Sequence, residues 1–393
     1  MKKSSIPFVG LHAHSVAGSP FDALGYPQDH MDYAYENGGE ALALTDHGNM
    51  NGMAYQVLHA KKMKEEGKNF KPIFGVEAYF IPSLDVWNEE RDRAKTDKKR
   101  ASELKDSTTM SVENEGETKR SKSILNQRSH LILLAQNQTG LNNIFAMISK
   151  SNSDKYFFRY PRVDYEVLRE HSEGVIAASA CMGGVYAANF WKHWDGEKEI
   201  VTDPEACTDA FRETTKNMVD IFGDRWYGEL QWHTDKKQHL INKLVIQMHK
   251  EFGIKLISTA DSHYPTPTAW KDRELYKRLG FLGKGKPSWL SDELPESVAE
   301  VGYELYPKNG DQMWESYKHY SELVGEDYDD DLVMDSITET HNIAFNRIEE
   351  FMPDNEVRLP SFVVPDGYTA DAALETTSLE SLNKLGLLTN PEY

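Results

Sequence analysis

The chain has 393 residues, with 44 Lys and Arg against 63 Asp and Glu, so its formal net charge is −19. Hydrophobic residues make up 39% and charged residues 27%, a globular composition that argues against a disordered or collagenous chain. The acidity argues against a basic groove that grips duplex DNA by neutralising its phosphates. It still allows a phosphate substrate that is held through bound cations.

The cysteine content and the apolar runs predict where the chain works. Cys181 and Cys207 are too few for a disulfide scaffold, which favours a reducing compartment. The N-terminus lacks the apolar run of a signal peptide, and no stretch approaches the roughly 20 apolar residues of a membrane helix. We therefore expect a soluble cytoplasmic protein without a membrane partner.

Seven short apolar runs of strand length follow one another along the chain, and most are continuous rather than alternating. They cover residues 6–11, 41–44, 72–76, 131–135, 174–180, 226–232 and 256–260. Helix-like stretches between several of the runs cover residues 27–37, 53–66, 141–149 and 236–252. Continuous apolar strands that alternate with helices predict parallel strands buried on both faces, and hence an α/β fold.

Seven parallel strands form either an open doubly wound sheet or a closed barrel. Polar side chains with metal-binding or catalytic chemistry end strand after strand in this sequence. In a barrel these strand ends converge on one face, whereas in an open sheet only the strands near a switch point would meet. The pattern therefore favours a seven-stranded β/α barrel over residues 1–270.

Two other segments differ from the strand–helix pattern. Residues 84–128 are rich in charged and small polar residues, which predicts a mobile charged insertion. Residues 271–393 contain several helix-like stretches and a proline-broken linker, which predicts a C-terminal helical extension.

The residues at the strand ends are of the types that bind transition metals. His12 and His14 share one face of an extended segment, and Asp261 and His263 repeat this spacing. Asp46, next to His47, is predicted to orient an imidazole rather than to bind a metal itself. Mixed imidazole, carboxylate and thiolate ligands fit zinc, manganese or iron. The predicted ligand set is His12, His14, Asp22, His47, Glu77, His130, Cys181, Asp261 and His263.

The same motifs, taken in order, carry a family resemblance. They are residues 11–14 (LHAH), 44–48 (LTDHG), 75–79 (GVEAY), 130–137 (HLILLAQN), 180–184 (ACMGG) and 260–264 (ADSHY). The series resembles the PHP domain, which is named after polymerases and histidinol phosphatase. Residues 227–231 (YGELQ) and 359–362 (LPSF) are similar to one branch of it, the N-terminal part of the bacterial-type DNA polymerase III alpha subunit.

The resemblance implies a distorted seven-stranded (β/α)7 barrel with two to three divalent metal ions, zinc or manganese being favoured. His12, His14, Glu77 and Asp261 would hold the first ion and act in catalysis through a metal-activated hydroxide. Glu77 would bridge to a second ion. The other ligands of the second ion would be His130 and Cys181, and those of the third Asp22, His47 and His263.

The resemblance also implies a role in DNA replication, with phosphoester hydrolysis of the 3′–5′ exonuclease or pyrophosphatase type. We find no cluster of polymerase aspartates in the sequence, so we expect polymerisation only with a separate palm and fingers chain. DNA would be met together with that partner, and other replisome subunits would bind, in the bacterial cytoplasm or in an infected host. Candidate phosphate or leaving-group contacts are Arg159, Arg162 and His233.

Two alternatives remain open at this point. One is a metal-stabilised docking domain of the replicase that catalyses nothing. The other is a small-molecule phosphatase like histidinol phosphatase. The sequence does not identify the metal or the substrate.

Overall fold

A computed structural model describes residues 4–96, 124–280, 293–354, 356 and 363–392. It divides into two compact units, Met1–Pro353 and Asp354–Tyr393. In the second unit, α14 (Ala370–Lys384) begins where the Thr369 side chain accepts a hydrogen bond from the Ala372 backbone N–H. The predicted domain boundary near residue 270 stays a prediction. Most of the predicted insertion, residues 97–123, lies outside the described residues.

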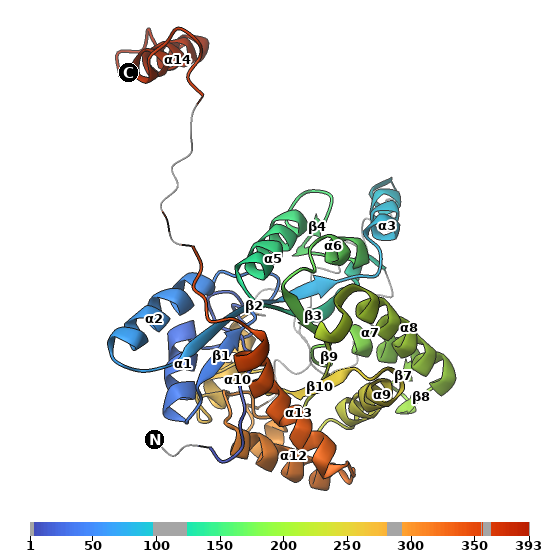
Figure 1. Cartoon of the computed structure of the whole chain (residues 1–393). Coiled ribbons are helices and arrows are strands. Elements are labelled where there is room, and N and C mark those ends of the chain that lie inside the picture. Colours follow the sequence, from blue (N-terminus) through green and yellow to red (C-terminus); the bar gives the residue numbers. More distant parts are fainter. Residues whose placement is uncertain (1–3, 97–123, 281–292, 355, 357–362, 393) are drawn as a thin grey trace. The chain divides into compact units, whose positions relative to one another are not determined.

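The first unit is built around a curled six-stranded sheet with the order β1-β2-β3-β6-β9-β10 (Figure 1). The α/β class predicted from the sequence is confirmed. The strands are β1 (Ala41–Leu44), β2 (Lys71–Phe80), β3 (Ser129–Ala135), β6 (Val175–Ala178), β9 (Trp226–Leu230) and β10 (Lys255–Ser258).

The two edges of the sheet are linked by the N-terminal segment, the first of the seven predicted strands. Gly10 forms a parallel bridge with Leu42 of β1, and Ala13 forms another with Ser262, just after β10. The His14 backbone N–H donates to the Ser262 carbonyl at 2.8 Å. Residues 10–13 thus take the place of a seventh strand, although the structure assigns them bridges rather than a full strand.

One strand direction differs from the all-parallel prediction. β3 pairs antiparallel with both β2 and β6, whereas β1–β2, β6–β9 and β9–β10 are parallel. His130 is the second residue of β3, so the reversed strand places it at the end of the sheet where the parallel strands finish. The antiparallel direction explains why this motif precedes its apolar run when the other motifs follow theirs.

Helices surround the sheet, with α1 and α2 near β1 and with α7, α8 and α9 near β9 (Figure 1). The helices that precede β10 in the chain are α1 (Pro27–Glu36), α2 (Met53–Glu65), α3 (Leu84–Thr96), α5 (Gln138–Ser151), α6 (Tyr165–Glu170), α7 (Val185–His193), α8 (Pro204–Phe222) and α9 (Lys236–Phe252). Later helices are α10 (Trp270–Leu279), α11 (Val298–Val301), α12 (Gly310–Val324) and α13 (Asp330–Asn342).

Shorter elements complete the description. They are the hairpins β4 (Phe157–Phe158) with β5 (Tyr160–Pro161) and β7 (Trp194–Asp195) with β8 (Ile200–Val201), the turns η1 (Ile124–Asn126) and η2 (Gly223–Arg225), and the π-helical turn η4 (Ile343–Arg347). The predicted insertion begins as helix α3 rather than as mobile chain, because Leu84 and Trp87 are buried in the core. Within the described ranges, no helix is long and apolar enough to span a bilayer.

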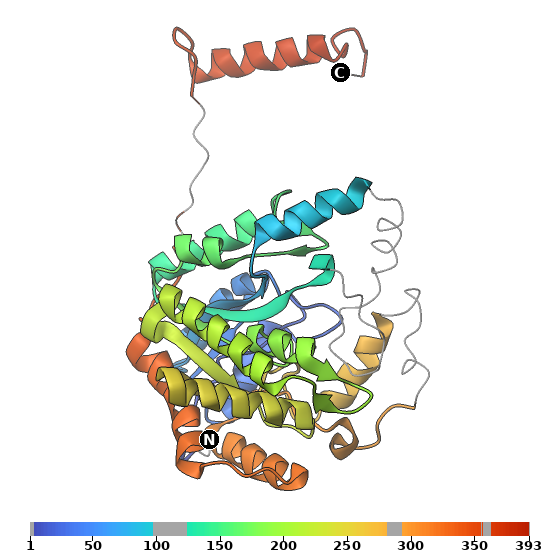
Figure 2. The same cartoon turned by 90° about the vertical axis from the view of Figure 1, so that its right-hand side faces the viewer.

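The end of the sheet away from the predicted ligands is closed by the segment after α13. Ile343, Ala344 and Ile348 are buried in one cluster with the inward-facing residues of the sheet. The Lys71 ammonium, at the start of β2, donates to the carbonyls of Ala344 and Ile348, each at 2.6 Å. Figure 2 shows α12 and α13 together at one end of this unit. The predicted helical extension therefore supplies part of the barrel core.

We expect Ile343→Ala to destabilise the first unit by about 3 kcal/mol, since it removes a fully buried side chain and leaves a cavity. Leu323→Ala is the matched control, because that leucine is 61% exposed and its loss should change stability by less than about 0.5 kcal/mol. Urea unfolding followed by circular dichroism measures both. Equal midpoints for the two variants would contradict the proposed role of the segment.

Candidate metal centre

All nine predicted ligands lie at one end of the curled sheet, and seven of them are buried. They come from separate elements: the N-terminal segment and its following loop, the end of β1, the strands β2 and β3, and the loops after β6 and β10. His47 and Asp22 are the two partly exposed members. The structure thus gathers residues that are up to 251 positions apart in the sequence into one cluster.

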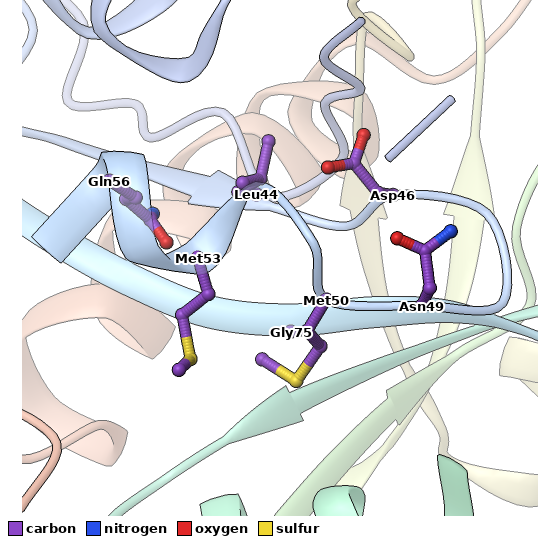
Figure 3. A pocket seen from close by; sticks show the side chains of 7 residues that line it. All are labelled: Leu44, Asp46, Asn49, Met50, Met53, Gln56 and Gly75. Atoms are coloured by element: carbon purple, nitrogen blue, oxygen red, sulfur yellow. The ribbon is translucent and has the colours of Figure 1, made fainter. Parts of the chain in front are cut away.

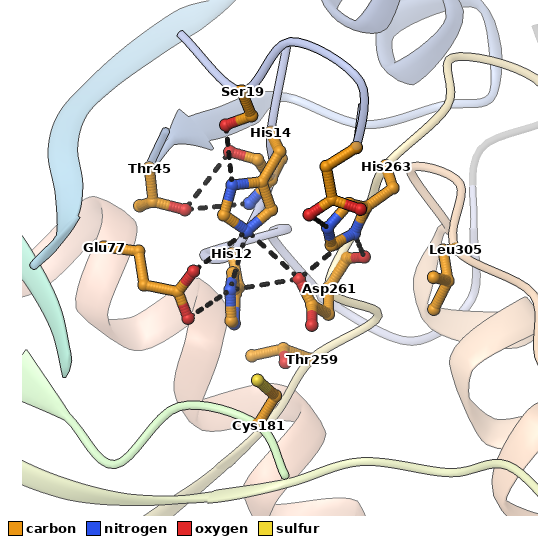
Figure 4. Close-up of polar contacts among 12 residues, drawn as sticks. His12, His14, Ser19, Thr45, Glu77, Cys181, Thr259, Asp261, His263 and Leu305 are labelled. Carbon is orange, nitrogen blue, oxygen red and sulfur yellow. Dashed lines mark hydrogen bonds and ion pairs between the residues drawn. The ribbon is translucent and has the colours of Figure 1, made fainter. Parts of the chain in front are cut away.

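Four side chains converge in the middle of this cluster (Figure 4). The Nε2 atoms of His12 and His14 lie 3.0 Å apart. Asp261 Oδ1 lies 3.1 Å from His12 Nε2 and 3.2 Å from His14 Nε2. Glu77 approaches the same two nitrogen atoms from the other side, at 3.4 and 3.5 Å. The four donors therefore face one shared point.

Glu77 also connects this group to a second one. Its Oε1 lies 2.9 Å from His130 Nδ1, and its Oε2 lies 2.6 Å from His47 Nδ1. Cys181 Sγ lies 3.7 Å from His130 Nδ1. Glu77 is thus placed between the donor groups, as a bridging ligand would be.

The third group lies around Asp22. Its Oδ2 lies 2.9 Å from His47 Nε2 and 3.3 Å from His263 Nε2. The His14 ring stacks between these two imidazoles, with centroid distances of 4.2 Å to His47 and 4.4 Å to His263. His47 therefore reaches both Glu77 and Asp22 through its two ring nitrogens.

The backbone at the site is strained at the ligands themselves. Phe21, Ala180 and Asp261 have φ angles of 66°, 59° and 47°, in the left-handed region that costs a non-glycine residue about 1–2 kcal/mol. Each is a predicted ligand or immediately precedes one. Gly184 allows the Cys181 loop to fold tightly, because a Cβ there would lie 2.0 Å from the Ser179 carbonyl oxygen. Such strain at a cluster of functional groups is typical of a binding site.

The buried charges at the site shift one another. Although burial opposes it, nearby acidic groups, led by Asp261 at His12 and by Tyr79 at His47, raise the pKa of both imidazoles well above the usual value. Although burial opposes it, nearby imidazoles, led by those of His130, His47 and His12, hold the pKa of Glu77 well below its usual range. The pKa of Asp261 is lowered in the same way, chiefly by His12 and His263. Burial lowers the pKa of His14 to about 3, so its imidazole is neutral at physiological pH. Ionised carboxylates and neutral imidazoles are the forms that ligate metals.

Several of these atoms are buried without a hydrogen bond. They are both Glu77 carboxylate oxygens, Asp261 Oδ1, His47 Nδ1 and His263 Nε2. Their close contacts are ion pairs between imidazoles and carboxylates, and these do not complete the hydrogen bonding of the atoms. Divalent cations would satisfy these atoms together, so the donor set fits metal ions.

Sequence analysis missed two residues that hold ligands in place. Glu229 of β9 lies with its Oε1 2.7 Å from His12 Nδ1 and also accepts hydrogen bonds from Gln231 and Thr259. This contact turns the other ring nitrogen of His12 toward the cluster. The available signal was a lone carboxylate within an otherwise uncharged strand. Arg273 of α10 donates to the Asp22 carbonyl and to Asp22 Oδ1, both at 2.7 Å.

One secondary prediction is corrected by the contacts, and another stays a prediction. Asp46 accepts hydrogen bonds from the Ser15 backbone, the Ser15 hydroxyl and the Ser19 hydroxyl. The Ser19 hydroxyl lies 3.4 Å from His14 Nδ1, so Asp46 reaches that imidazole through Ser19. Arg162 is 1% exposed and donates to four backbone carbonyls, so it is a structural residue and not a phosphate contact. Burial, followed by the charge of nearby Arg128, lowers its pKa to about 9.

The other two proposed phosphate contacts stay predictions. Arg159 forms the turn of the β4–β5 hairpin with a φ of 61°. His233 lies beside a pocket of about 270 Å³ that Lys308 also lines. Its Nδ1 accepts from the Asp235 backbone N–H at 3.2 Å. Burial lowers the pKa of His233 to about 4.

A second small pocket lies beside the end of β1, and it has no room for a water molecule (Figure 3). None of its lining residues belongs to the predicted ligand set. The lining residues are Leu44, Asp46, Asn49, Met50, Met53, Gln56 and Gly75. We interpret this pocket as a packing gap behind the cluster.

Comparison with known families decides the identity of the fold. A family model described as the PHP domain matches residues 10–233, more than half of the chain. The chain belongs to the PHP family. The match covers His12, His14, Asp22, His47, Glu77, His130 and Cys181, and it ends before Asp261 and His263.

The most informative relatives of this PHP chain are DNA polymerase III alpha subunits. The protein from Aquifex aeolicus is 31% identical over 262 residues, which is 66% of this chain and 18% of the relative. The protein from Thermus aquaticus is 27% identical over 388 residues, which is 98% of this chain and 26% of the relative. The chain therefore spans about a fifth to a quarter of the length of the curated relatives that it matches.

A solved amidohydrolase from Chromobacterium violaceum matches 68% of this PHP chain and 96% of its own chain. The two are 13% identical and the TM-score is 0.33. At this score, the similarity carries no weight for the fold or for the activity.

Proposed function

We propose that the chain is the metal-dependent phosphoesterase module of a replicase of the DNA polymerase III alpha type. The observation that carries the proposal is the convergence of nine ligand-type side chains on one end of the sheet, several with buried atoms that lack hydrogen bonds. Membership of the PHP family and similarity to alpha subunits support it. The proposed cofactors are two to three divalent ions, zinc or manganese.

We propose a place for each residue among the donor groups. His12, His14 and Asp261 would hold one ion together with Glu77, which would bridge to a second ion held by His130 and Cys181. A third would be held by Asp22, His47 and His263. Divalent ions there would supply Lewis acidity toward a phosphoryl oxygen and a nucleophile at neutral pH.

The chain's own residues would prepare the site for that chemistry. With metal bound, Glu229 would hold the His12 proton at Nδ1, which would leave the Nε2 lone pair facing the cluster. Arg273 fixes Asp22 through one hydrogen bond to its carboxylate and one to its backbone carbonyl. The buried walls exclude water and strengthen every electrostatic contact with a phosphate.

The proposed reaction is hydrolysis of a phosphodiester or phosphoanhydride, either 3′–5′ trimming of DNA or cleavage of pyrophosphate. We further propose that the module acts within a replicase, where it meets DNA and other replisome subunits. Similarity to DNA polymerase III alpha subunits supports this proposal.

The test is hydrolysis by the full chain loaded with manganese or zinc. A 3′-labelled primer, bis(p-nitrophenyl) phosphate and pyrophosphate are the substrates. We expect His14→Ala to abolish turnover while circular dichroism still reports a folded chain. His319→Ala, which changes an exposed histidine on α12, should retain full activity. A folded, metal-loaded wild-type chain that cleaves none of the three substrates would favour a docking domain and overturn the proposal.

A further inference from the structure

Arg128 lies just before β3 and two residues from His130, and its guanidinium has no carboxylate partner in the described part of the chain. The Cζ atom lies 4.1 Å from the centre of the Tyr160 ring and 5.7 Å from that of Tyr79. Its Nε atom is buried without a hydrogen bond. The donors of this arginine are therefore available, while its flat face is held by two aromatic rings.

The two tyrosines connect Arg128 to the metal-ligand cluster. The Tyr79 ring lies 5.4 Å from the His130 ring and 6.1 Å from the His47 ring, nearly parallel to the latter. Tyr160 meets Tyr79 edge to face at 5.3 Å. The Tyr79 ring therefore contacts both the Arg128 guanidinium and the predicted ligands His47 and His130.

The backbone fixes this aromatic platform. The Val163 N–H donates to the Tyr79 carbonyl at 2.9 Å, which ties the chain after the β4–β5 hairpin to β2. A Cβ at Gly48 would lie 3.0 Å from Pro161 and 3.1 Å from the Tyr79 ring, so only glycine leaves room for this packing. The Arg128 side chain is therefore preorganised rather than free in solvent.

Other stacked arginines in the same region are already occupied. Arg162 packs on Trp87, and its guanidinium donates hydrogen bonds to backbone carbonyls. Arg91 also lies over Trp87, at 5.1 Å, and donates to the Asp154 carbonyl. Arg128 differs from both, because within the described ranges its guanidinium donates to no backbone carbonyl and its Nε atom has no hydrogen bond.

We propose that Arg128, held against Tyr79 and Tyr160, forms a subsite that binds a second phosphate next to the phosphate held at the metal centre. The inference rests on the proposed phosphoesterase function and specifies its substrate class as a polynucleotide strand, which carries neighbouring phosphates. A guanidinium binds a phosphate through paired hydrogen bonds.

The test measures binding separately from catalysis. Fluorescence anisotropy at low salt follows a short labelled single-stranded oligodeoxynucleotide added to the full, chelator-treated chain. We expect Arg128→Gln to weaken binding about tenfold or more, and Arg128→Lys to restore part of the loss. Arg91→Gln, which removes an arginine from a different aromatic ring, should leave binding unchanged. Melting temperatures verify that every variant is folded.

Two results would overturn the subsite. One is a folded Arg128→Gln chain that binds the oligonucleotide as tightly as the wild type. The other is displacement of the oligonucleotide by inorganic phosphate at equal concentration, which would indicate a site for a single phosphate. A wild-type chain that binds the oligonucleotide through Arg128 and hydrolyses nothing would support the subsite while contradicting the phosphoesterase function, so the two failures are distinct.

Discussion

Glu77→Gln is expected to lower metal-dependent phosphoester hydrolysis about a thousandfold, since Lewis-acid catalysis contributes several kcal/mol to the rate. Glu77 is fully buried and its two oxygens approach four different histidines. The amide keeps the size of the side chain but removes the negative charge that would bridge two ions. Initial rates with manganese at saturating substrate measure the loss.

Glu229→Gln is the matched comparison, because it changes another buried carboxylate, which contacts His12 on the side away from the cluster. Loss of such an outer partner lowers metal affinity or activity about 10–100-fold. Glu77→Gln should therefore lower the rate of hydrolysis more than Glu229→Gln does. If the two glutamines had equal effects, Glu77 would not be a bridging ligand.

Adding manganese or zinc to the chelator-treated chain is expected to stabilise the first unit by about 3–4 kcal/mol at concentrations 100 to 1,000 times the dissociation constant. The metal-free cluster buries atoms of Glu77, Asp261, His47 and His263 that lack hydrogen bonds. Cations would satisfy these atoms in the folded state only, which shifts the folding equilibrium toward that state.

Urea unfolding with and without metal measures this gain. His14→Ala should lose most of it, whereas His319→Ala should show the wild-type gain. Lowering the pH should weaken metal stabilisation, because the imidazoles must lose protons to ligate. Equal gains in wild type and His14→Ala would mean that the metal stabilises the chain from a different place.

Much of the fold follows from the apolar runs, and the errors have physical causes. Continuous apolar strands are buried in either direction, so their pattern alone does not distinguish parallel from antiparallel β3. The sequence did indicate the direction of β3, because His130 precedes its apolar run, whereas the other motifs follow theirs. The sequence analysis placed the segment around Ile343 in a helical extension after the barrel, because its contact with the sheet interior depends on tertiary packing.

The ligand set was predictable because each residue lies beside a strand end, and strand ends meet in a barrel. The residues that orient ligands were not, since Glu229 and Arg273 act through contacts with residues more than 200 positions away. The arginines proposed as phosphate contacts illustrate the same limit. Arg162 donates to four backbone carbonyls, whereas the Nε atom of Arg128 has no hydrogen bond within the described residues.

The central claim is that the clustered side chains hold divalent metal ions. Calorimetric titration of the chelator-treated chain with manganese or zinc tests it most directly, with Glu77→Gln as the comparison. The account predicts two to three ions bound per wild-type chain and fewer in the variant. Binding of no ion by the folded wild-type chain, or the same number by wild type and Glu77→Gln with equal affinities, would contradict it.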